Sequence, residues 1–525
     1  KKTGEIKYIY NFETQNYKLK EGSYASEIFQ KKIFGKIGKI IENDDDDNLV
    51  EIISKPGTEQ PPEVFTFGPG PSPGTSVIQG ALTKFMKSYC EDNSLHFKCG
   101  IDILENTFPD ILSLKKGDPI IDNNKDIVSE TIKAVKALNS SYLLIQGPPG
   151  AGKTYISAKI ILDLIKNKKR VGITSNSHKA INNLLSQIEE LAIEEKFTFK
   201  GSKISSKPDD RFNGKIIDDI GSVKKEKDYD FANQLFAGTS WLFSDARLNH
   251  KIDYLFVDEA GQVSLANTLA ISTSAKNIIL IGDQMQLSQP IKGTHAGNAG
   301  KSALEYLLSD YDTIPPNRGI FLDKTRRLNY KICDYVSESF YDSRLKPHEI
   351  TKERYVKLQS KTIKDEGISF ISMDHLNCSQ KSDEEVKEIN SMIKDIIGKD
   401  CKDSGTNKER KINLEDILIV APFNMQVNNL ARNLPKQSKV GTIDKFQGQE
   451  AKVVFVSMTS SDPENLPRHK EFFFSRNRLN VAISRAQCST IILFNPNLLN
   501  ASCSKINEMR LVNNFCKLLK YKVTN

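Results

Sequence analysis

Residues 147–154 form the sequence Gly147-Pro148-Pro149-Gly150-Ala151-Gly152-Lys153-Thr154. The apolar run Ser141 to Gln146 precedes it and a helical run, Tyr155 to Ile165, follows it, which is the context that a phosphate-binding P-loop requires. Its glycines let backbone N–H groups curl around a phosphate, and the start of the following helix favours the negative charge. Lys153 supplies a mobile positive charge, and the Thr154 hydroxyl can bind Mg²⁺. The segment therefore predicts a nucleoside triphosphate site.

Two adjacent carboxylates, Asp258 and Glu259, follow the apolar run Tyr254 to Val257. Carboxylates at the end of a buried strand are costly unless a cation or a proton uses them. Asp258 fits the role of holding Mg²⁺, and Glu259 would orient and deprotonate an attacking water. Beside a P-loop, the pair predicts hydrolysis of the bound nucleotide.

From about Asp126 onward, short apolar β-rich runs alternate with helical segments, a pattern typical of parallel sheets covered on both faces. The chain therefore belongs to the α/β class, with two successive α/β units. The expected strands of the two units are Ser141 to Gln146, Arg170 to Thr174, Tyr254 to Val257, Asn277 to Ile281, Gly367 to Ser372, Ile417 to Ala421, Val453 to Ser457 and Thr490 to Phe494. Between the units, Ser382-Asp383-Glu384-Glu385 predicts a capping box that opens a helix to about Ile397.

The first residues predict a small β-barrel followed by a helical stalk at about Ser76 to Tyr89. The runs Ile33 to Ile41 and Leu49 to Ile53 flank four consecutive aspartates, 44–47, which we interpret as a solvated hairpin tip rather than a metal site. A connector rich in proline and glycine follows the barrel. The polar, lysine-rich stretches 195–230 and 398–412 are interpreted as surface insertions.

Composition limits the class of protein but does not identify its binding partner. The 525 residues carry a net charge of +8, which is compatible with a polyanion. No apolar run reaches the ~18–20 residues that span a bilayer, so no membrane partner is expected. The chain lacks an initiator Met, so we expect that it was cut from something longer. Its eight cysteines form no C-x-x-C pair, which favours a reduced, cytoplasmic protein, and the His96/Cys99 and His375/Cys378 spacings are taken as structural.

Six motifs, in their order along the chain, resemble those of superfamily 1 helicases of the 5′→3′ branch (superfamily 1B, Upf1-like). The resemblance covers about residues 120 to 500. After the P-loop, the matching segments are Asp258 to Gln262, Gly282 to Leu287, Thr325 to Leu328, Thr442 to Glu450 and Asn480 to Ala486. The segments Ser177 to Leu185 and Gly282 to Pro290 are similar, more narrowly, to the helicase half of bacterial and archaeal proteins with a RecB-like nuclease domain.

The resemblance implies two tandem RecA-like P-loop domains with ATP and Mg²⁺ in the cleft between them. It divides the chain into residues 1–115 (a barrel and stalk similar to accessory domain 1B), 116–320 (domain 1A) and 321–525 (domain 2A). Arg485 would be an arginine finger, which can be worth ~10³–10⁵ in rate. The implied catalytic residues are Lys153, Glu259, Gln286, Arg327 and Arg485, the implied Mg²⁺ ligands Thr154 and Asp258, and the implied nucleotide contacts residues 147–154 with Arg326, Gly448 and Glu450.

The resemblance also implies a track for single-stranded nucleic acid across both domains. Hydroxyls, backbone N–H groups and helix starts near strand ends can hold phosphates without reading sequence. The expected contacts are Ser175, Asn176, His178, Thr239, Ser240, Pro422 and Thr442. For His178, phosphate contact and a capping or packed role are about equally open. Trp241 is expected in the core, with base stacking as the alternative.

Two positions depart from the family's pattern. Thr131 stands where the family carries a Gln that reads adenine, and Thr325-Arg326 replaces the usual Gln-Tyr pair. Arg326 can still stack on a base through its guanidinium plane. The preference for ATP is therefore inherited from the family rather than derived from these residues.

The implied function is an ATP-dependent nucleic-acid translocase or helicase, 5′→3′ on single-stranded DNA, in a prokaryotic cytoplasm. The alternatives are a nucleotide-gated clamp that serves a nuclease domain or subunit, and an RNA helicase. The intact Glu259, Gln286, Arg327 and Arg485 favour turnover over a clamp. The contacts to the 2′-hydroxyl that distinguish RNA from DNA come from loops that the motifs do not identify.

Overall fold

The computed structural model describes residues 4–13, 19, 21–28, 32–41, 48–68, 74–91, 96–205, 207–221, 229–289, 291, 293, 295–360, 362–406, 408–446 and 448–521. The four consecutive aspartates and part of the proline-rich connector lie outside these residues. Within the described residues, no helix is long and apolar enough to cross a membrane.

The first sheet has eight parallel strands in the order β13-β6-β12-β11-β7-β10-β8-β9. Their bounds are β6 Tyr142–Gln146, β7 Val171–Thr174, β8 Gly201–Lys203, β9 Ile217–Asp219, β10 Leu235–Ala237, β11 Ile252–Val257, β12 Ala275–Gly282 and β13 Gly319–Phe321. Alternate residues of β6 point to opposite faces, as the pleat requires. Leu143 and Ile145 join one core, whereas Tyr142 and Leu144 join another.

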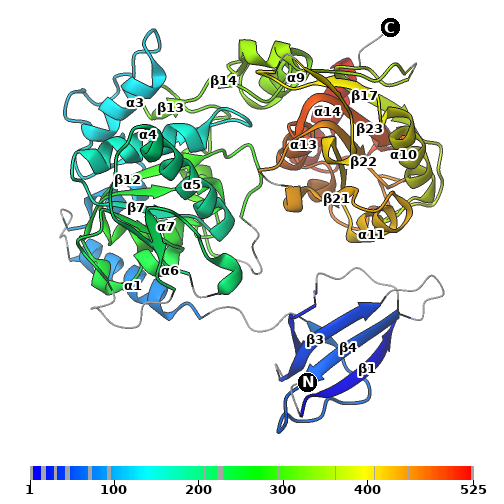
Figure 1. The fold of residues 1–525 in the computed structure, drawn as a ribbon, viewed down its shortest axis with the longest axis horizontal. Helices are drawn as coiled ribbons and strands as arrows, with labels where there is room; N and C mark the ends of the chain where they lie inside the picture. Colours follow the sequence, from blue (N-terminus) through cyan, green and yellow to red (C-terminus); the bar gives the residue numbers. More distant parts are fainter. Residues whose placement is uncertain are drawn as a thin grey trace.

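Helices cover both faces of this sheet, which explains its continuous apolar strands (Figure 1). Helices α3 (Ile127–Lys136), α4 (Lys153–Lys166) and α5 (His178–Glu194) share the core of one face. The opposite core receives α1 (Ser76–Cys90), α2 (Lys98–Leu104), α6 (Ser240–Phe243), α7 (Leu265–Ser272) and α8 (Ala303–Leu307).

The second sheet has five parallel strands in the order β17-β23-β22-β20-β21. Its strands are β17 Gly367–Ser372, β20 Ile417–Ala421, β21 Lys439–Thr442, β22 Ala451–Ser457 and β23 Ala486–Phe494. The helices of this region are α9 Tyr330–Phe340, α10 Asp383–Ile396, α11 Asn424–Asn433, α12 Lys470–Phe473, α13 Arg476–Ile483 and α14 Ile506–Leu518. The two parallel sheets confirm the predicted α/β class.

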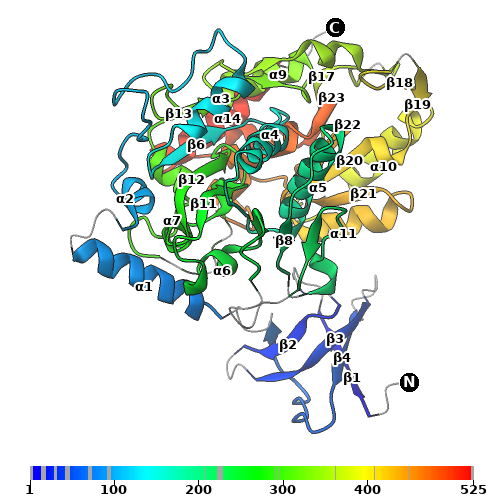
Figure 2. The ribbon, with the colours of Figure 1, turned by 60° about the vertical axis from the view of Figure 1, so that its left-hand side comes forward.

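The N-terminal strands form a separate antiparallel sheet in the order β1-β4-β3-β2-β5. The bounds are β1 Ile6–Phe12, β2 Tyr24–Glu27, β3 Ile33–Ile41, β4 Asn48–Ser54 and β5 Phe67–Gly68. Figure 2 shows this sheet apart from the two α/β units, whereas α1 lies against α7 of the first unit. Strands β3 and β4 pair as predicted on either side of the aspartate run.

The first lysine-rich stretch, 195–230, is not simply a surface insertion, contrary to the prediction. In the first stretch, β8 and β9 extend the edge of the large sheet, and Lys203 is fully buried with its ammonium 3.2 Å from the Asp219 carboxylate. The second stretch, 398–412, stays largely on the surface as predicted. It holds β18 (Asp400–Lys402) and the exposed β19 (Glu409–Lys411), and β18 pairs with both β19 and β16 (Tyr355–Lys357). A short pair, β14 (Lys324–Thr325) and β15 (Lys346–Pro347), completes the strands. Polarity misled the prediction because buried ion pairs and edge strands both accommodate lysine.

Two smaller expectations are also corrected. Ser382 caps α10, but the Glu385 side chain does not return to it; Glu385 is fully buried and bonds His375 and Thr459 instead. Trp241 is not in the core: it is 40% exposed, and its indole N–H donates to the Gly74 carbonyl at 2.8 Å.

Candidate nucleotide and nucleic-acid site

Three neighbouring strands of the first sheet end at the same edge. The P-loop follows β6, Asp283 follows β12 and Asp258 follows β11, and these strands are adjacent in the order β6-β12-β11. The backbone N–H of Gly147 donates to the Gly282 carbonyl at 2.9 Å, which ties the start of the P-loop to the end of β12. Because the carboxyl ends of parallel strands form the usual ligand crevice of such sheets, this edge is the candidate nucleotide site.

The P-loop has the conformation that glycine permits. Gly150 and Gly152 have φ of +73° and +83°, and Gly152 is the N-cap of α4. Lys153 begins that helix, and its ammonium donates to the Gly147 carbonyl at 2.7 Å. The lysine therefore closes the loop on itself, at the place where a phosphate would compete for it.

The acidic pair follows β11 with strained geometry. Asp258 is buried, and Glu259 has a φ of +52°, an uncommon conformation for a residue other than glycine. Burial raises the pKa of Asp258 to about 7, with a further contribution from Glu259, whereas Lys153 acts against it. A buried carboxylate whose charge is unfavourable alone is suited to a divalent cation, so the surroundings of Asp258 fit Mg²⁺. Thr154, the other predicted ligand, is the second residue of α4.

Gln286 is buried beside the same edge. Its amide nitrogen donates to Asp283 Oδ2 at 2.8 Å, and the Met285 backbone N–H donates to Asp283 Oδ1 at 3.1 Å. Burial raises the pKa of Asp283, while the positive charge of Lys153 opposes the shift. Asp283 therefore links Gln286, through a hydrogen bond, to the electrostatic influence of the P-loop lysine.

Arg327 of the second unit faces this edge, and Arg485 of the same unit feels the charge of Glu259. Arg327 lies against the P-loop, since a Cβ built on Gly150 would come within 2.4 Å of Arg327 Cβ. Arg327 Nε donates to Glu450 Oε2 at 2.5 Å. Arg485 is fully buried and donates to the Val481 and Gln449 carbonyls, each at 3.1 Å. Burial, reinforced by Arg327, lowers the pKa of the Arg485 guanidinium to about 9, so it is charged at neutral pH.

The segment that carries Arg327 is bound directly to the P-loop. Thr325 Oγ1 donates to the Pro149 carbonyl and the Arg326 N–H to the Gly150 carbonyl, both at 2.8 Å. Gly448 has a φ of +79° and precedes Glu450 on the connection to β22. The structure thus places residues 147–154, 326–327, 448–450 and 485 at one interface between the units.

A cavity of about 950 Å³ adjoins the P-loop and is lined by Ala151, Gly152, Tyr155 and Arg326 among others. Its size suits a nucleobase and a ribose. Thr131 does not line it: this side chain is fully buried in α3, with its hydroxyl donating to the Ile127 carbonyl at 2.6 Å.

The predicted track residues of the first unit follow the neighbouring strands β7 and β10. Ser175 and Ser240 are buried, yet neither hydroxyl has a hydrogen-bond partner among the described residues, and the same is true of His178 Nδ1. Burial, and secondly Lys203, lower the pKa of His178. Asn176 donates to the Gln262 carbonyl, and Thr239 is the N-cap of α6. Clustered unpaired donors at strand ends are suited to an oxygen-rich ligand.

In the second unit, Pro422 follows β20 and Thr442 ends β21, two strands that pair with Ala421 opposite Thr442. Both residues are half-buried. The structure therefore brings the predicted contacts together as two groups, one at the carboxyl edge of each sheet.

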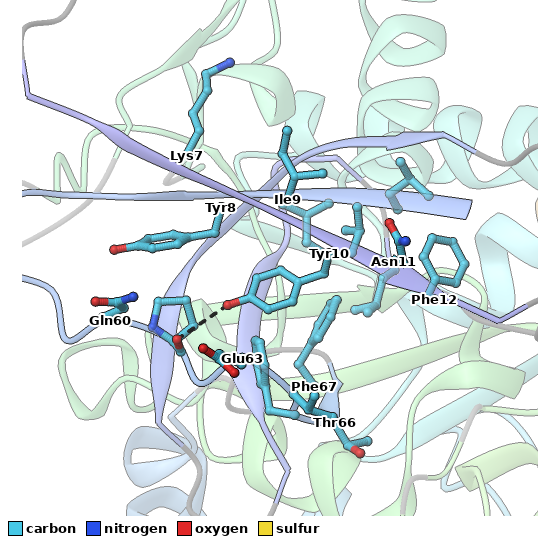
Figure 3. A pocket seen from close by; sticks show the side chains of 17 residues that line it. Lys7, Tyr8, Ile9, Tyr10, Asn11, Phe12, Gln60, Glu63, Thr66 and Phe67 are labelled. Atoms are coloured by element: carbon cyan, nitrogen blue, oxygen red, sulfur yellow. Dashed lines mark hydrogen bonds between the residues drawn. The ribbon is translucent and has the colours of Figure 1, made fainter. Parts of the chain in front are cut away.

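The N-terminal sheet, in which β1 and β5 are the two edge strands, has a cavity of about 940 Å³ that the sequence did not indicate. Figure 3 shows Tyr8, Tyr10 and Phe67 on one side of β1 and Lys7 and Ile9 on the other. The Tyr10 hydroxyl donates to the Pro62 carbonyl at 2.9 Å, which joins β1 to the segment after β4.

Sequence reasoning missed several residues that join the two units. Asn477 Nδ2 donates to the Gln284 and Gln286 carbonyls at 2.9 and 2.5 Å, and Arg476 forms an ion pair with Asp312 at 2.6 Å. Within the second unit, Arg354 supports the segment that reaches the P-loop, because it donates to the carbonyls of Arg326 and Arg327 at 2.9 and 3.1 Å. Asn480, inside a recognised motif, also donates to the Met285 carbonyl of the first unit. The sequence could not show these contacts, because no property of a single Asn or Arg indicates a partner on another domain.

A P-loop and strand-end carboxylates that face arginines of a second parallel sheet define a P-loop protein with two RecA-like units. Residues 131–291 and 299–497 each match a family model described as an AAA domain. The chain belongs to the superfamily 1 helicases, in the branch called superfamily 1B.

The relatives are distant but extensive. DNA replication ATP-dependent helicase/nuclease dna2 of Schizosaccharomyces pombe is 26% identical over 423 residues, 75% of this chain and 29% of the relative. ATP-dependent helicase NAM7 of Saccharomyces cerevisiae is 25% identical over 494 residues, 84% of this chain and 49% of the relative. The chain thus spans less than half the length of these two curated relatives. A solved structure, arterivirus nonstructural protein 10 (helicase) with DNA, aligns over 94% of this chain and 77% of its own, with 11% identity and a TM-score of 0.40.

Proposed function

We propose that the chain is an ATP-dependent nucleic-acid translocase or helicase that moves 5′→3′ on single-stranded DNA. The observation that carries the proposal is the position of Arg327, which lies against Gly150 of the P-loop and pairs with Glu450 of the second unit. A triphosphate in the P-loop would thus meet cations from both units, so its presence or loss changes how the units attract each other.

Each residue contributes by its placement. The P-loop N–H groups and Lys153 would hold the phosphates, and Asp258 and Thr154 would hold Mg²⁺, which would supply positive charge next to the phosphate oxygens. Glu259 accepts a proton from the attacking water. Arg327 and Arg485 stabilise the charge that develops on the γ-phosphoryl group, and Gln286 orients it. The proposed domain limits remain 1–115, 116–320 and 321–525.

For the track, the proposal rests on the unpaired polar atoms of Ser175, Ser240 and His178 and on the paired strand ends at Pro422 and Thr442. These groups contact phosphates rather than base edges, so binding is independent of sequence. DNA is favoured because two of the curated relatives compared are named as DNA replication helicase/nucleases. For the same reason a nuclease domain or subunit is the proposed partner. The eight cysteines form no disulfide among the described residues, which favours a reducing compartment such as the cytoplasm.

A nucleotide-gated clamp remains the second candidate function. The closed Lys153–Gly147 contact and the buried Arg485 favour it, because both must rearrange when a nucleotide binds, and a clamp needs only that rearrangement.

The test is ATP hydrolysis by the purified chain with no nucleic acid, with single-stranded DNA and with single-stranded RNA. We expect strong stimulation of hydrolysis by one polymer and a loss of about 10²-fold or more in Glu259→Gln, since a general base contributes that much. Binding of a polymer without a rise in wild-type hydrolysis would overturn the motor and leave the clamp.

A further inference from the structure

Two buried side chains outside the predicted site, Tyr341 and Asn480, connect it across the interface between the units. Tyr341 directly follows α9, which packs on β17, β23 and α13 of the second unit. Its hydroxyl donates to Asp283 Oδ2 of the first unit at 2.6 Å. Asn480 Nδ2 of α13 donates to the same hydroxyl at 2.9 Å and to the Met285 carbonyl at 2.8 Å.

The donor and acceptor roles in this network follow from its chemistry. The Met285 carbonyl can only accept, so the nitrogen of the Asn480 amide must face it. The same nitrogen then donates to Tyr341, whose single proton is left for Asp283. Burial, followed by the charge of Asp283, raises the pKa of Tyr341 well above its usual value, so the hydroxyl keeps that proton.

The network ends at the two groups proposed to meet the γ-phosphoryl. Asp283 accepts from Gln286 as well as from Tyr341, both through Oδ2. Asn480 lies on α13, whose C-cap residue, Ser484, immediately precedes Arg485. Asp283, Tyr341, Asn480 and Gln286 are each at most 6% exposed, so water does not replace these bonds. The Asn480 amide oxygen has no hydrogen-bond partner among the described residues, which is unusual for a buried group and indicates a network that can rearrange.

We propose that the Tyr341 hydroxyl is a positioning group that couples Gln286 of the first unit to the Arg485-bearing helix of the second. The inference rests on the proposed function, because it assumes that Gln286 turns toward a γ-phosphate. When Gln286 leaves Asp283, the carboxylate keeps Tyr341 and the Met285 N–H as its donors. The buried charge therefore stays satisfied, and α13 stays attached through Asn480. Without the hydroxyl, Asp283 retains Gln286, and the sensor cannot turn.

The test is steady-state ATP hydrolysis by the full chain with saturating single-stranded DNA. Tyr341→Phe removes one oxygen and is expected to lower kcat about tenfold, within the usual range of coupling between sites, with the KM for ATP within about twofold of wild type. The matched control is Tyr335→Phe, a fully buried tyrosine of α9 whose hydroxyl has no hydrogen bond to the first unit among the described residues, and it should leave both constants unchanged. A merely structural role of Tyr341 would change the unfolding temperature without separating kcat from KM.

A double variant tests the route of the coupling. In a Gln286→Ala background, Tyr341→Phe should change kcat by less than about twofold, because the two act through one carboxylate. If Tyr341→Phe does not fold, Asn480→Ala removes the hydrogen bond between α13 and the Tyr341 hydroxyl. This variant is expected to lower kcat by a similar factor. Wild-type rates in Tyr341→Phe, or fully additive effects with Gln286→Ala, would overturn the inference. Absence of DNA-stimulated hydrolysis in the wild type would instead overturn the proposed function.

Discussion

The two parallel sheets contribute to the interface from opposite ends of their strands. In the first sheet, the P-loop, Asp258 and Asp283 all follow strands, and so do the track residues Ser175 and Ser240. In the second sheet, Glu450 and Arg485 precede β22 and β23, whereas the track residues lie at the carboxyl ends of β20 and β21.

The first unit thus has the predicted nucleotide and track residues on one edge of its sheet, and the second unit has them on opposite edges. Strand β22 has seven residues and is about 20 Å long at 3.3 Å per residue. In the proposed function the second unit would act as a lever, because a small rotation at its arginine end displaces its track end. The predictions below test whether the two ends of the second sheet have these separate roles.

The largest effect is expected at the arginine end. Arg485→Ala should lower kcat for ATP about 10³-fold, as for an arginine finger, while single-stranded DNA still binds. The measurement is steady-state hydrolysis together with a DNA-binding titration. Arg510→Ala, an exposed arginine on α14, is the control and should match wild type. Equal losses of hydrolysis and of DNA binding would contradict a division of roles.

A substitution in the P-loop tests the contact between the units. Gly150→Ala adds a methyl group 2.4 Å from Arg327 Cβ, at a φ of +73° that L side chains rarely adopt. A strain of about 1–3 kcal/mol corresponds to roughly 10- to 100-fold weaker nucleotide binding. Titration with a fluorescent ATP analogue checks this. Gly80→Ala, where nothing lies within 4 Å of the added atom, should bind like wild type, and a tolerant Gly150 would mean that Arg327 does not approach the loop.

The track end of the second sheet depends on a buried carboxylate. Glu385 accepts from the Ser457 hydroxyl, from the Thr459 N–H and from His375, and Thr459 has a φ of +71°. Glu385→Ala leaves these groups unpaired and should lower the free energy of unfolding by about 2 kcal/mol. Chemical denaturation measures it, with the exposed Asp395→Asn on the same helix as the control. An unchanged stability would show that the loop after β22 is held by other contacts.

The track end of the first sheet is expected to give a smaller effect. Replacing both Ser175 and Ser240 by Ala removes two unpaired hydroxyls, and affinity for single-stranded DNA should fall about tenfold at roughly 0.7 kcal/mol each. Hydrolysis without nucleic acid should stay unchanged. Ser274→Ala, whose buried hydroxyl donates to Ile271 just before β12, is the control at the opposite edge. DNA affinity equal to wild type would place the track elsewhere.

The smallest effect concerns pH and the stalk. His250 Nε2 lies 3.4 Å from His96 Nε2, and burial first, then His96, Lys84 and Lys276, lower the pKa of His250 below its usual 6.5. The unfolded chain therefore binds more protons just below pH 6.5, so stability is lost as the pH falls through that window. Between about pH 7 and about pH 5.5, the melting temperature of His250→Asn should fall less than that of wild type. The corresponding difference in the free energy of unfolding should be under about 1 kcal/mol. Melting temperatures that fall equally with pH in the variant and in wild type would contradict the lowered pKa of His250.

The sequence predicted most of the strands that carry the site because buried parallel strands are continuous apolar runs. The predicted bounds of β17 and β20 are the observed ones. Strands β8, β9, β18 and β19 were missed, because they are short and polar and have no hydrophobic periodicity. For the site, the P-loop and the acidic pair could be predicted, because glycine spacing and carboxylates at a strand end are local sequence patterns. Tyr341 and Asn480 could not be found, because their roles depend on partners from another unit. Trp241 was misplaced because its indole N–H finds a backbone partner at the surface.

The most direct test of the lever is the affinity of Glu259→Gln for single-stranded DNA with and without Mg²⁺ and ATP, since this variant should bind nucleotide without consuming it. We expect bound nucleotide to change the DNA dissociation constant by about tenfold, a typical coupling between two sites. The same dissociation constant in both conditions, with nucleotide binding verified, would contradict the claim that the two edges of the second sheet move together.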